Sequence, residues 1–248
     1  MKLGIALTVF ALTLYEISGA TVEASKPDEF TQLLARLKSA SPTERSDAAA
    51  QLGSLGDRRA VEPLIAVLKD PSPDVRAATA DALSQLGDKR ATEPVLALLQ
   101  DDVAFVRSAA ARVLGQLGDA KAVEPLIAAL KDSSPSVRGS AAFGLSALKD
   151  ERAVPALLAM VRDEAPDVRA AVATALGSLH DKRAVEPLMA ALADEYKMVK
   201  VAVALALADI GDKRAVAALD AAIKAEKDDE ARSHMREALQ RLMAVPDN

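Results

Sequence analysis

The chain has 248 residues, of which half are apolar and only 2% aromatic, and it contains no tryptophan. Its formal net charge is −5 with both signs interspersed, so it lacks the basic stripe with which proteins bind nucleic-acid phosphates. The absence of cysteine excludes a disulfide framework, a thiolate nucleophile and a cysteine-based zinc site.

The first 20 residues differ in composition from the rest of the chain. Lys2 precedes a run of apolar, glycine and threonine residues that extends through Leu14, and Ser18 and Ala20 place small residues at the −3 and −1 positions of a cleavage site. This layout is typical of a secretory signal peptide, and the run is shorter than the roughly 20 residues of a bilayer span. A signal-anchor and a buried capping helix are the alternatives. We expect residues 1–20 to direct export to the periplasm or the extracellular space and to be cleaved, which leaves no membrane span in the mature chain.

The remainder of the sequence repeats with a period of 31 residues. Asp57 recurs at this step as far as Asp212, and Leu52 recurs as far as Leu207. A fixed period of this length indicates a solenoid, in which each repeat buries its apolar face only by stacking on its neighbours. The predicted organisation is a signal peptide (1–20), a flexible lead-in (21–25), a repeat domain (26–243) of seven units (26–56, 57–87, 88–118, 119–149, 150–180, 181–211 and 212–243, the last with one extra residue) and a C-terminal tail (244–248).

Each unit is predicted to form two helices. In the second unit Val61, Leu64 and Leu68 fall on one helical face, and Val75 and Leu83 fall on one face of the next helix. Neither helix is long enough to be stable alone in water, so both must pack against their neighbours. The predicted fold is therefore an all-α solenoid.

Helix-capping residues recur at the same step. Asp57 suits the N-cap of the first helix, the Ser-Pro dipeptide at 72–73 suits the start of the second, and Gly87 suits the left-handed turn that ends it. Lys149 and His180 stand where four other units have this glycine. We expect those two turns to be strained or differently closed.

The recurring pattern GDxRAVEPLIxxLKDxxPxVRxxAxxAL resembles the HEAT-like repeats named after phycobilisome lyases, and also the artificial proteins built from a consensus of such repeats. The resemblance covers nearly the whole chain after the predicted signal peptide. It implies a right-handed superhelix of stacked helix pairs, armadillo-like in architecture, with the second helices along the concave side. It implies little about function, because this repeat occurs in unrelated proteins.

Residues suited to catalysis are scarce. The only two histidines, His180 and His234, lie 54 residues apart, and the sequence has no glycine-rich phosphate loop or serine elbow. The repeat family includes deoxyhypusine hydroxylase, which binds iron with His-Glu pairs, but this sequence has no His-Glu dipeptide. It also includes the phycobilin lyases, which remain the enzyme alternative. We predict no catalytic residue, no metal site and no cofactor.

A basic residue recurs in the second helix of six units. Arginine has five donors, which suit helix-end carbonyls and carboxylates of a neighbouring unit, so we expect a structural hydrogen-bond ladder; the alternative is an anion-binding row. Removal of Arg107 should cost roughly 3 kcal/mol if its aspartate partner is buried. The predicted ladder residues are Arg45, Arg76, Arg107, Arg138, Arg169 and Lys200, together with the recurring Asp57, Asp88, Asp119, Asp150, Asp181 and Asp212.

A binding site should occupy positions that face the groove and vary between repeats. We assign these to the residue after the recurring basic residue and to those four and eight further on; they are polar in the early units and apolar in the late ones. An apolar patch with a polar rim is the usual mark of a protein interface. The predicted partner-binding residues are Arg112, Gly139, Phe143, Thr174, Val201 and Leu205.

Two other interpretations remain open for these side chains. Phe143 could tuck between helices while Leu205 packs on the seventh unit, or the partner could bind the loop edge at Phe105, Tyr196 and Met198. The leading hypothesis is an exported, monomeric scaffold that binds another protein in its groove and does not bind nucleic acid. The alternative is an accessory subunit of the phycobilin lyase type, with a small ligand or a modified protein as its client.

Overall fold

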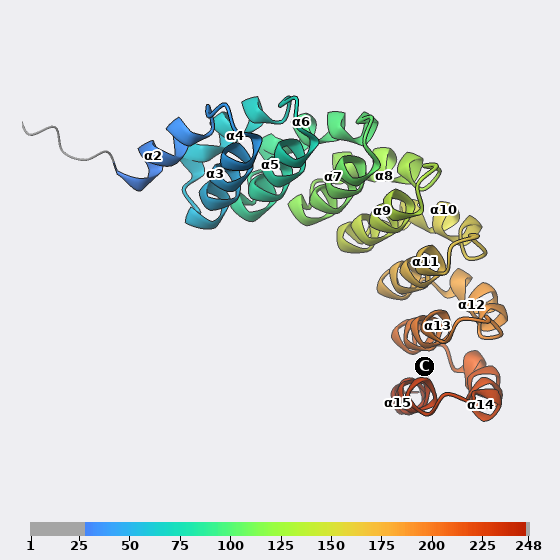
Figure 1. The fold of residues 1–248 in the computed structure, drawn as a ribbon. Helices are drawn as coiled ribbons and strands as arrows, with labels where there is room; N and C mark the ends of the chain where they lie inside the picture. The colour runs from blue at the N-terminus through green and yellow to red at the C-terminus, as the bar shows by residue number, and fades with distance from the viewer. Residues whose placement is uncertain (1–27, 247–248) are drawn as a thin grey trace, which may run out of the picture.

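The computed structural model describes residues 28–246. The predicted signal peptide (1–20) and lead-in (21–25) lie outside the described residues, as does the end of the predicted tail. In the described part, all regular structure is helical and the helices follow one another in seven pairs. Figure 1 shows the pairs stacked side by side in a bent, elongated solenoid.

Each pair has an outer first helix and an inner second helix (Figure 1). The first helices are α2 (Glu29–Arg36), α4 (Val61–Val67), α6 (Thr92–Ala97), α8 (Val123–Ala129), α10 (Val154–Ala159), α12 (Val185–Ala191) and α14 (Val216–Ala225). The second helices are α3 (Pro42–Leu55), α5 (Pro73–Leu86), α7 (Ala104–Leu117), α9 (Pro135–Leu148), α11 (Pro166–Ser178), α13 (Lys197–Ile210) and α15 (Asp229–Ala244).

Short-range capping fixes the ends of these helices. Asp57 accepts a hydrogen bond from the backbone N–H of Arg59 at 2.9 Å and so caps a 3₁₀ turn, Arg58–Ala60, that leads directly into α4. The second helix α5 begins at Pro73 and ends at Gly87, whose φ of 62° lies in the left-handed region. The predicted caps at Asp57 and Gly87 are confirmed, because an N-cap carboxylate and a C-terminal glycine each satisfy a requirement of the backbone. Ser72 stands at the N-cap of α5 as predicted, but its hydroxyl makes no capping hydrogen bond; its backbone N–H donates to Asp70 instead.

Two of the turns that end second helices have no glycine. Lys149 and His180 both take a φ of 52°, a region that disfavours any residue with a Cβ. α11 also ends one residue early, at Ser178. His180 Nδ1 lies 2.6 Å from the backbone oxygen of Asp209, so the imidazole ties this turn to the following repeat. The expectation of strained or altered turns at both positions is confirmed.

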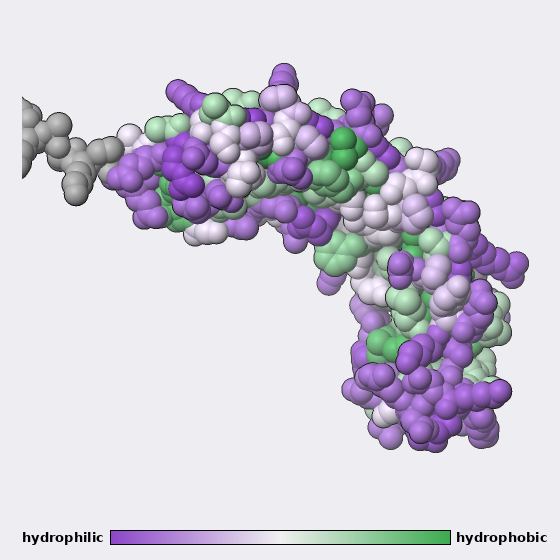
Figure 2. All heavy atoms as spheres, viewed as in Figure 1, coloured by the Kyte–Doolittle hydropathy of each residue, from purple (hydrophilic) through white to green (hydrophobic). Residues whose placement is uncertain are grey.

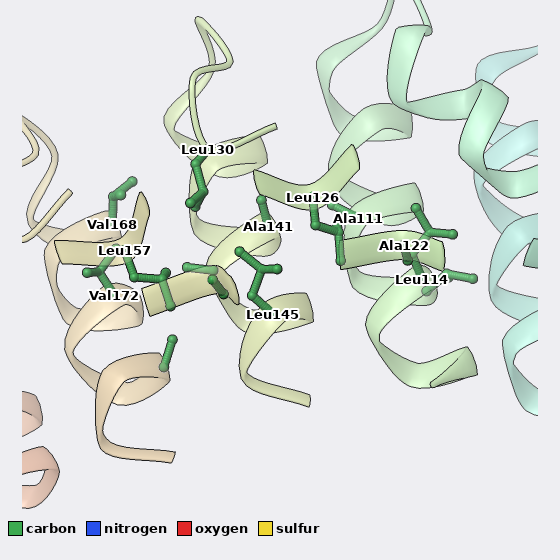
Figure 3. Packing of buried hydrophobic residues seen from close by; sticks show 14 of the residues in the cluster. Ala111, Leu114, Ala122, Leu126, Leu130, Ala141, Leu145, Leu157, Val168 and Val172 are labelled. Atoms are coloured by element: carbon green, nitrogen blue, oxygen red, sulfur yellow. The ribbon is translucent and has the colours of Figure 1, made fainter. Parts of the chain in front are cut away.

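The core is one continuous layer between the two rows of helices. Each repeat contributes one fully buried leucine from its second helix, and most contribute another from the first. In Figure 3, Leu126 of α8 lies beside Ala111 and Leu114 of α7, so the first helix of one repeat packs on the second helix of the repeat before. Because every layer is shared between neighbours, the short helices are stabilised by stacking rather than individually.

Candidate functional site

The second helices line the inner side of the bend, and we call this surface the concave face. It is defined by three positions on each second helix: the residue after the recurring basic residue, and those four and eight further on. Side chains at all of these positions in α3 to α13 are at least partly exposed. Figure 2 shows apolar, green atoms between the purple ones on the inner side of the bend, over the later repeats.

Phe143 is the most exposed of the predicted apolar anchors. Half of its surface is open to solvent, so the ring projects from α9 and is not tucked between helices. Gly139 lies one turn earlier on the same helix, and a Cβ built there would meet no atom within 4 Å. The backbone beside the ring is therefore open, and the two residues form a step on the concave face.

Three other predicted residues meet in a pocket further along the face. Thr174 from α11 and Val201 and Leu205 from α13 line a shallow, mainly apolar cavity of about 300 Å³. The side of α15 closes it through Glu230, Ala231 and His234, and Lys197 of α13 also lines it. The sequence left open whether Leu205 faces the groove or packs on the seventh repeat. In the structure it does both, since it lines the pocket together with residues of α15.

Arg112 does not join these residues. Its Nη2 donates to Asp81 Oδ1 of the preceding second helix at 2.5 Å, and Nη1 donates to Gln116 on its own helix at 3.4 Å. The predicted rim residue is thus engaged one repeat before Phe143, in a half-exposed ion pair. The structure brings together Thr174, Val201 and Leu205, and leaves Arg112 on the polar, early part of the face.

Several charges on and beside the later concave face are paired within the protein. Asp209 accepts from Arg241 Nη2 at 2.5 Å, and Lys197 donates to Asp228 at 2.8 Å. Across α9 and α11 the defining positions carry Gly, Phe, Ala, Thr and Ser only. The α9 and α11 part of the concave face is therefore uncharged in a chain of which 27% is charged. Further along, Asp209 occupies a defining position of α13, and Lys197 and Glu230 line the pocket.

The arginine ladder runs along the loop edge of the solenoid. Arg107 Nε and Nη2 donate to the two carboxylate oxygens of Asp132 in the next repeat at 2.8 and 2.9 Å, and Nη1 donates to the backbone oxygen of Asp101 in its own repeat at 2.8 Å. Both side chains of this pair are only about 15% exposed. This planar, two-bond pairing is the geometry for which arginine is suited and lysine is not.

The carboxylates that pair with the ladder arginines are not those of the predicted Asp57 series but those of a second series that begins at Asp70. The Asp57 series caps the 3₁₀ turns, and all of its members except Asp119 also bind the arginine two residues further on. This series begins the first helices and so lies at the opposite end of the second helices from the ladder. The ladder pairs are Arg45–Asp70, Arg76–Asp101, Arg107–Asp132, Arg138–Asp163, Arg169–Asp194 and Lys200–Glu226.

The seventh repeat keeps the ladder's backbone bond despite its extra residue. Arg232 Nη1 donates to the backbone oxygen of Glu226 at 2.8 Å, as Arg107 does to that of Asp101. Its Nη2 pairs with Asp229 on the same helix. The row is consistent with a structural role, since its donors are occupied by the protein's own carboxylates and carbonyls.

Ladder pairing changes the ionisation of the aspartates. The hydrogen bond from Arg107 lowers the pKa of Asp132 below its ordinary value, against a smaller opposing effect of burial. The hydrogen bond from Arg76 lowers the pKa of Asp101 in the same way. These carboxylates are therefore charged throughout the neutral range, and the pairs hold adjacent repeats together there.

The residues of the loop edge divide into two groups. Phe105 and Tyr196 are each nearly half exposed, and the Tyr196 ring lies 5.6 Å from the guanidinium carbon of Arg169. Met198, assigned to the same edge from the sequence, lies at the loop end of α13 and also lines the pocket with Val201 and Leu205. Its spacing contained the signal: Met198, Val201 and Leu205 fall at i, i+3 and i+7, on one face of α13.

The two histidines lie in different surroundings and do not form a common site. His180 closes a turn and His234 borders the pocket. Between residues 28 and 246, no group of three or more histidine and acidic side chains is arranged to hold a metal. Nor does this part of the chain contain a helix long and apolar enough to cross a bilayer.

The sequence profile of HEAT repeats matches this chain at residues 30–113, 104–171 and 158–240. No curated protein matches it significantly.

Several solved structures share the architecture. A chain of the CpcE–CpcF complex of phycocyanin lyase from Nostoc sp. PCC7120 is 22% identical, with 89% of this chain and 97% of that chain covered and a TM-score of 0.59. The Escherichia coli protein YibA is 23% identical, with coverages of 87% and 81% and a TM-score of 0.65. A chain of the Kap95p–RanGDP complex is 14% identical over 88% of this chain and 36% of its own, with a TM-score of 0.68. At these identities the likeness establishes the fold.

Proposed function

The chain belongs to the HEAT-repeat family, and we propose that it is a non-catalytic scaffold that binds another protein on its concave face, over α9 to α15. The observation that carries this proposal is the succession of exposed apolar groups on neighbouring second helices, from the half-exposed ring of Phe143 on α9 to the mainly apolar pocket of Thr174, Val201 and Leu205. Exposed apolar side chains on a concave surface with a paired, polar margin are typical of protein interfaces.

The fold is suited to this role. Solenoids present an extended concave surface whose shape is set by stacking and whose side chains vary freely between repeats. Two similar solenoids were solved as assemblies with another protein, CpcE with CpcF and Kap95p with RanGDP. They support the use of this fold as a scaffold without identifying the partner of this chain.

A crosslinking pull-down tests the proposal. The chain from Thr21 onward is the bait, and it is compared with a Phe143→Asp, Leu205→Asp double variant that places two carboxylates on the proposed interface. Central apolar anchors typically contribute 2 kcal/mol or more each, so we expect capture of the partner to fall by at least about 30-fold. Circular dichroism establishes that the variant remains folded.

Phe105→Asp is the matched control for this experiment. Phe105 is 46% exposed, close to the value for Phe143, but it lies at the loop edge. Capture that survives Phe105→Asp and is lost in the double variant would support the concave face. Equal capture by the bait and the double variant would remove the site from this face, and loss in Phe105→Asp alone would place it on the loop edge.

We also propose that the protein is exported and acts as a monomer in the periplasm or the extracellular space. The layout of residues 1–20 is the basis for this proposal. Mass spectrometry of the protein from its source should find a mature N-terminus at Thr21. An intact N-terminus would instead indicate an uncleaved anchor or a capping segment.

The pocket favours one second candidate function. Its volume of about 300 Å³ is at the lower limit of small-molecule sites, so an accessory role with a small ligand or a modified client protein, as in the phycobilin lyases, is the alternative. Native mass spectrometry of the purified protein distinguishes the two. A bound small molecule that is lost in Leu205→Asp would favour the ligand-handling role.

A further inference from the structure

The second helices are not evenly packed along the solenoid. Glycine occupies one position of the second helix in every other repeat, at Gly53, Gly115 and Gly177, a spacing of 62 residues. At each of them, an added Cβ would lie within 3 Å of backbone atoms of the next second helix. At these junctions, backbone therefore packs directly on backbone.

The junction between α7 and α9 is the tightest of the three. Gly115 faces Gly144, so glycine is present on both sides. A Cβ on Gly144 would in turn come within 2.7 Å of the backbone oxygen of Ala111. Neither helix could accept a methyl group here without moving, because the atoms in the way are backbone and cannot change rotamer.

The intervening junctions are built differently. The equivalent positions there are Ser84, Ser146 and Ala208, each with a Cβ that holds the next helix further away. Ser84 Oγ donates to Gln116 and Ser146 Oγ donates to Ser178, both at 2.8 Å. The backbones of α3 and α5, α7 and α9, and α11 and α13 accordingly run close together over more of their length than those of the other neighbouring pairs.

We infer that the solenoid consists of two-repeat modules and bends between them. The modules are joined through the α5–α7, α9–α11 and α13–α15 junctions. Close-packed backbone has no room to yield, whereas helices that are held apart by side chains can shift, because side chains can change rotamer. In a solenoid, whose stability is a sum of nearest-neighbour interfaces, unequal interfaces produce cooperative units larger than one repeat.

The modules divide the concave face in a particular way. Thr174 and Leu205 lie on α11 and α13, within one module, so this part of the pocket is rigid, while its α15 side lies across the yielding α13–α15 junction. Phe143 lies on α9, across a yielding junction. This consequence, unlike the modules themselves, rests on the proposed function: one anchor moves relative to the pocket and lets the face adjust to its partner.

The inference is tested by hydrogen–deuterium exchange of the full chain carrying one substitution that creates a cavity in the core. Leu176→Ala removes a fully buried side chain of α11, which has α9 on one side and α13 on the other. A leucine-to-alanine cavity costs about 2–5 kcal/mol. We expect amide exchange in α13, the module partner, to accelerate at least about tenfold, and exchange in α9 to change by less than about twofold.

Because α9 and α13 flank the substituted helix α11 on its two sides, each serves as the control for the other. An equal acceleration in α9 and α13, or a larger one in α9, would overturn the inference, and so would the acceleration of all seven second helices together. If Leu176→Ala fails to fold, Val172→Ala provides a smaller cavity at another fully buried position of α11. None of these outcomes depends on a partner, so failure of the modules and failure of the proposed function are separable.

Discussion

Individual side chains of the ladder bind each repeat to the next. Asp101 illustrates the arrangement: its carboxylate accepts from Arg76 of the preceding repeat and from the backbone N–H of Val103, while its backbone oxygen accepts from Arg107. A single aspartate thus connects the loop of its own repeat to the preceding repeat, and Arg107, which binds its backbone oxygen, extends the connection to Asp132 of the next repeat. Loss of any rung leaves a poorly solvated charge without its partner.

Arg107→Ala is the most direct test of this role. We expect the free energy of unfolding to fall by about 3 kcal/mol, because Asp132 would keep its charge in a site that is mostly shielded from water. Arg112→Ala is the matched control, since its pair with Asp81 is about 40% exposed and should contribute less than about 1 kcal/mol. Urea unfolding of both variants provides the comparison, and equal losses would contradict the ladder's role.

The ladder also predicts a dependence of stability on pH. Because pairing lowers the pKa of Asp132 in the folded protein below its unfolded value, the resulting stability is complete above the unfolded pKa and is lost as pH falls through the folded one. The melting temperature should therefore decline as pH is lowered from about 5 to about 2. Asp132→Asn should show a shallower decline than the native chain over this range, and an unchanged slope would contradict the assignment.

For the ladder, the sequence predicted the hydrogen-bond donors, which are the recurring arginines, better than the carboxylates that accept from them. The recurring arginine was recognisable from its period, but the Asp57 and Asp70 series share that period of 31 residues. Period alone cannot decide which carboxylate lies within reach, because that depends on which end of the second helix each loop occupies. The part of Met198 in the pocket was not predicted, since its nearness to the loop concealed its register with Val201 and Leu205.

The helices differ most in how closely they approach one another. Gly139 and Gly144 share α9, yet one faces open space and the other faces the backbone of α7. Glycine in a helix interior is otherwise unfavourable by roughly 0.5–1 kcal/mol relative to alanine. Its presence at Gly144 is explained by close packing, while at Gly139 only the proposed step beside Phe143 gives it a role.

These two glycines provide a matched pair of substitutions on one helix. Gly139→Ala should stabilise the protein by about 0.5–1 kcal/mol, because it improves helix propensity without a clash. Gly144→Ala should destabilise it by about 1–3 kcal/mol, because α7 and α9 must separate to admit the methyl group. Thermal unfolding measures both, and a stabilising Gly144→Ala would refute the close contact.

The elements themselves were largely predictable. Apolar spacing, capping aspartates and terminal glycines identified both helices of each unit, because each of these signals acts within one turn of the chain. The close junctions were not predicted from Gly115 and Gly144, since a helical glycine has the same appearance in sequence whether it faces a neighbour or solvent. Only the stacking of adjacent repeats distinguishes them.

The whole molecule follows from the addition of nearly identical units. Seven helix pairs in the described residues bury one shared core and leave two long surfaces. The solenoid was predictable from the repeat, because stacking is the only way in which such short helices bury their apolar faces. The position of the pocket was predictable only in part, because α15 completes it from a repeat whose register slips by one residue.

Partner binding by the concave face is the central claim, and site-specific photocrosslinking tests it most directly. A photoreactive residue replaces Ala147, exposed on the concave side of α9, or Ala128, exposed on the outer helix α8 of the same repeat. We expect the partner to be crosslinked from position 147 at least about tenfold more efficiently than from position 128, since a bound protein excludes solvent from only one face. Equal crosslinking from both positions, or crosslinking from position 128 alone, would contradict the account.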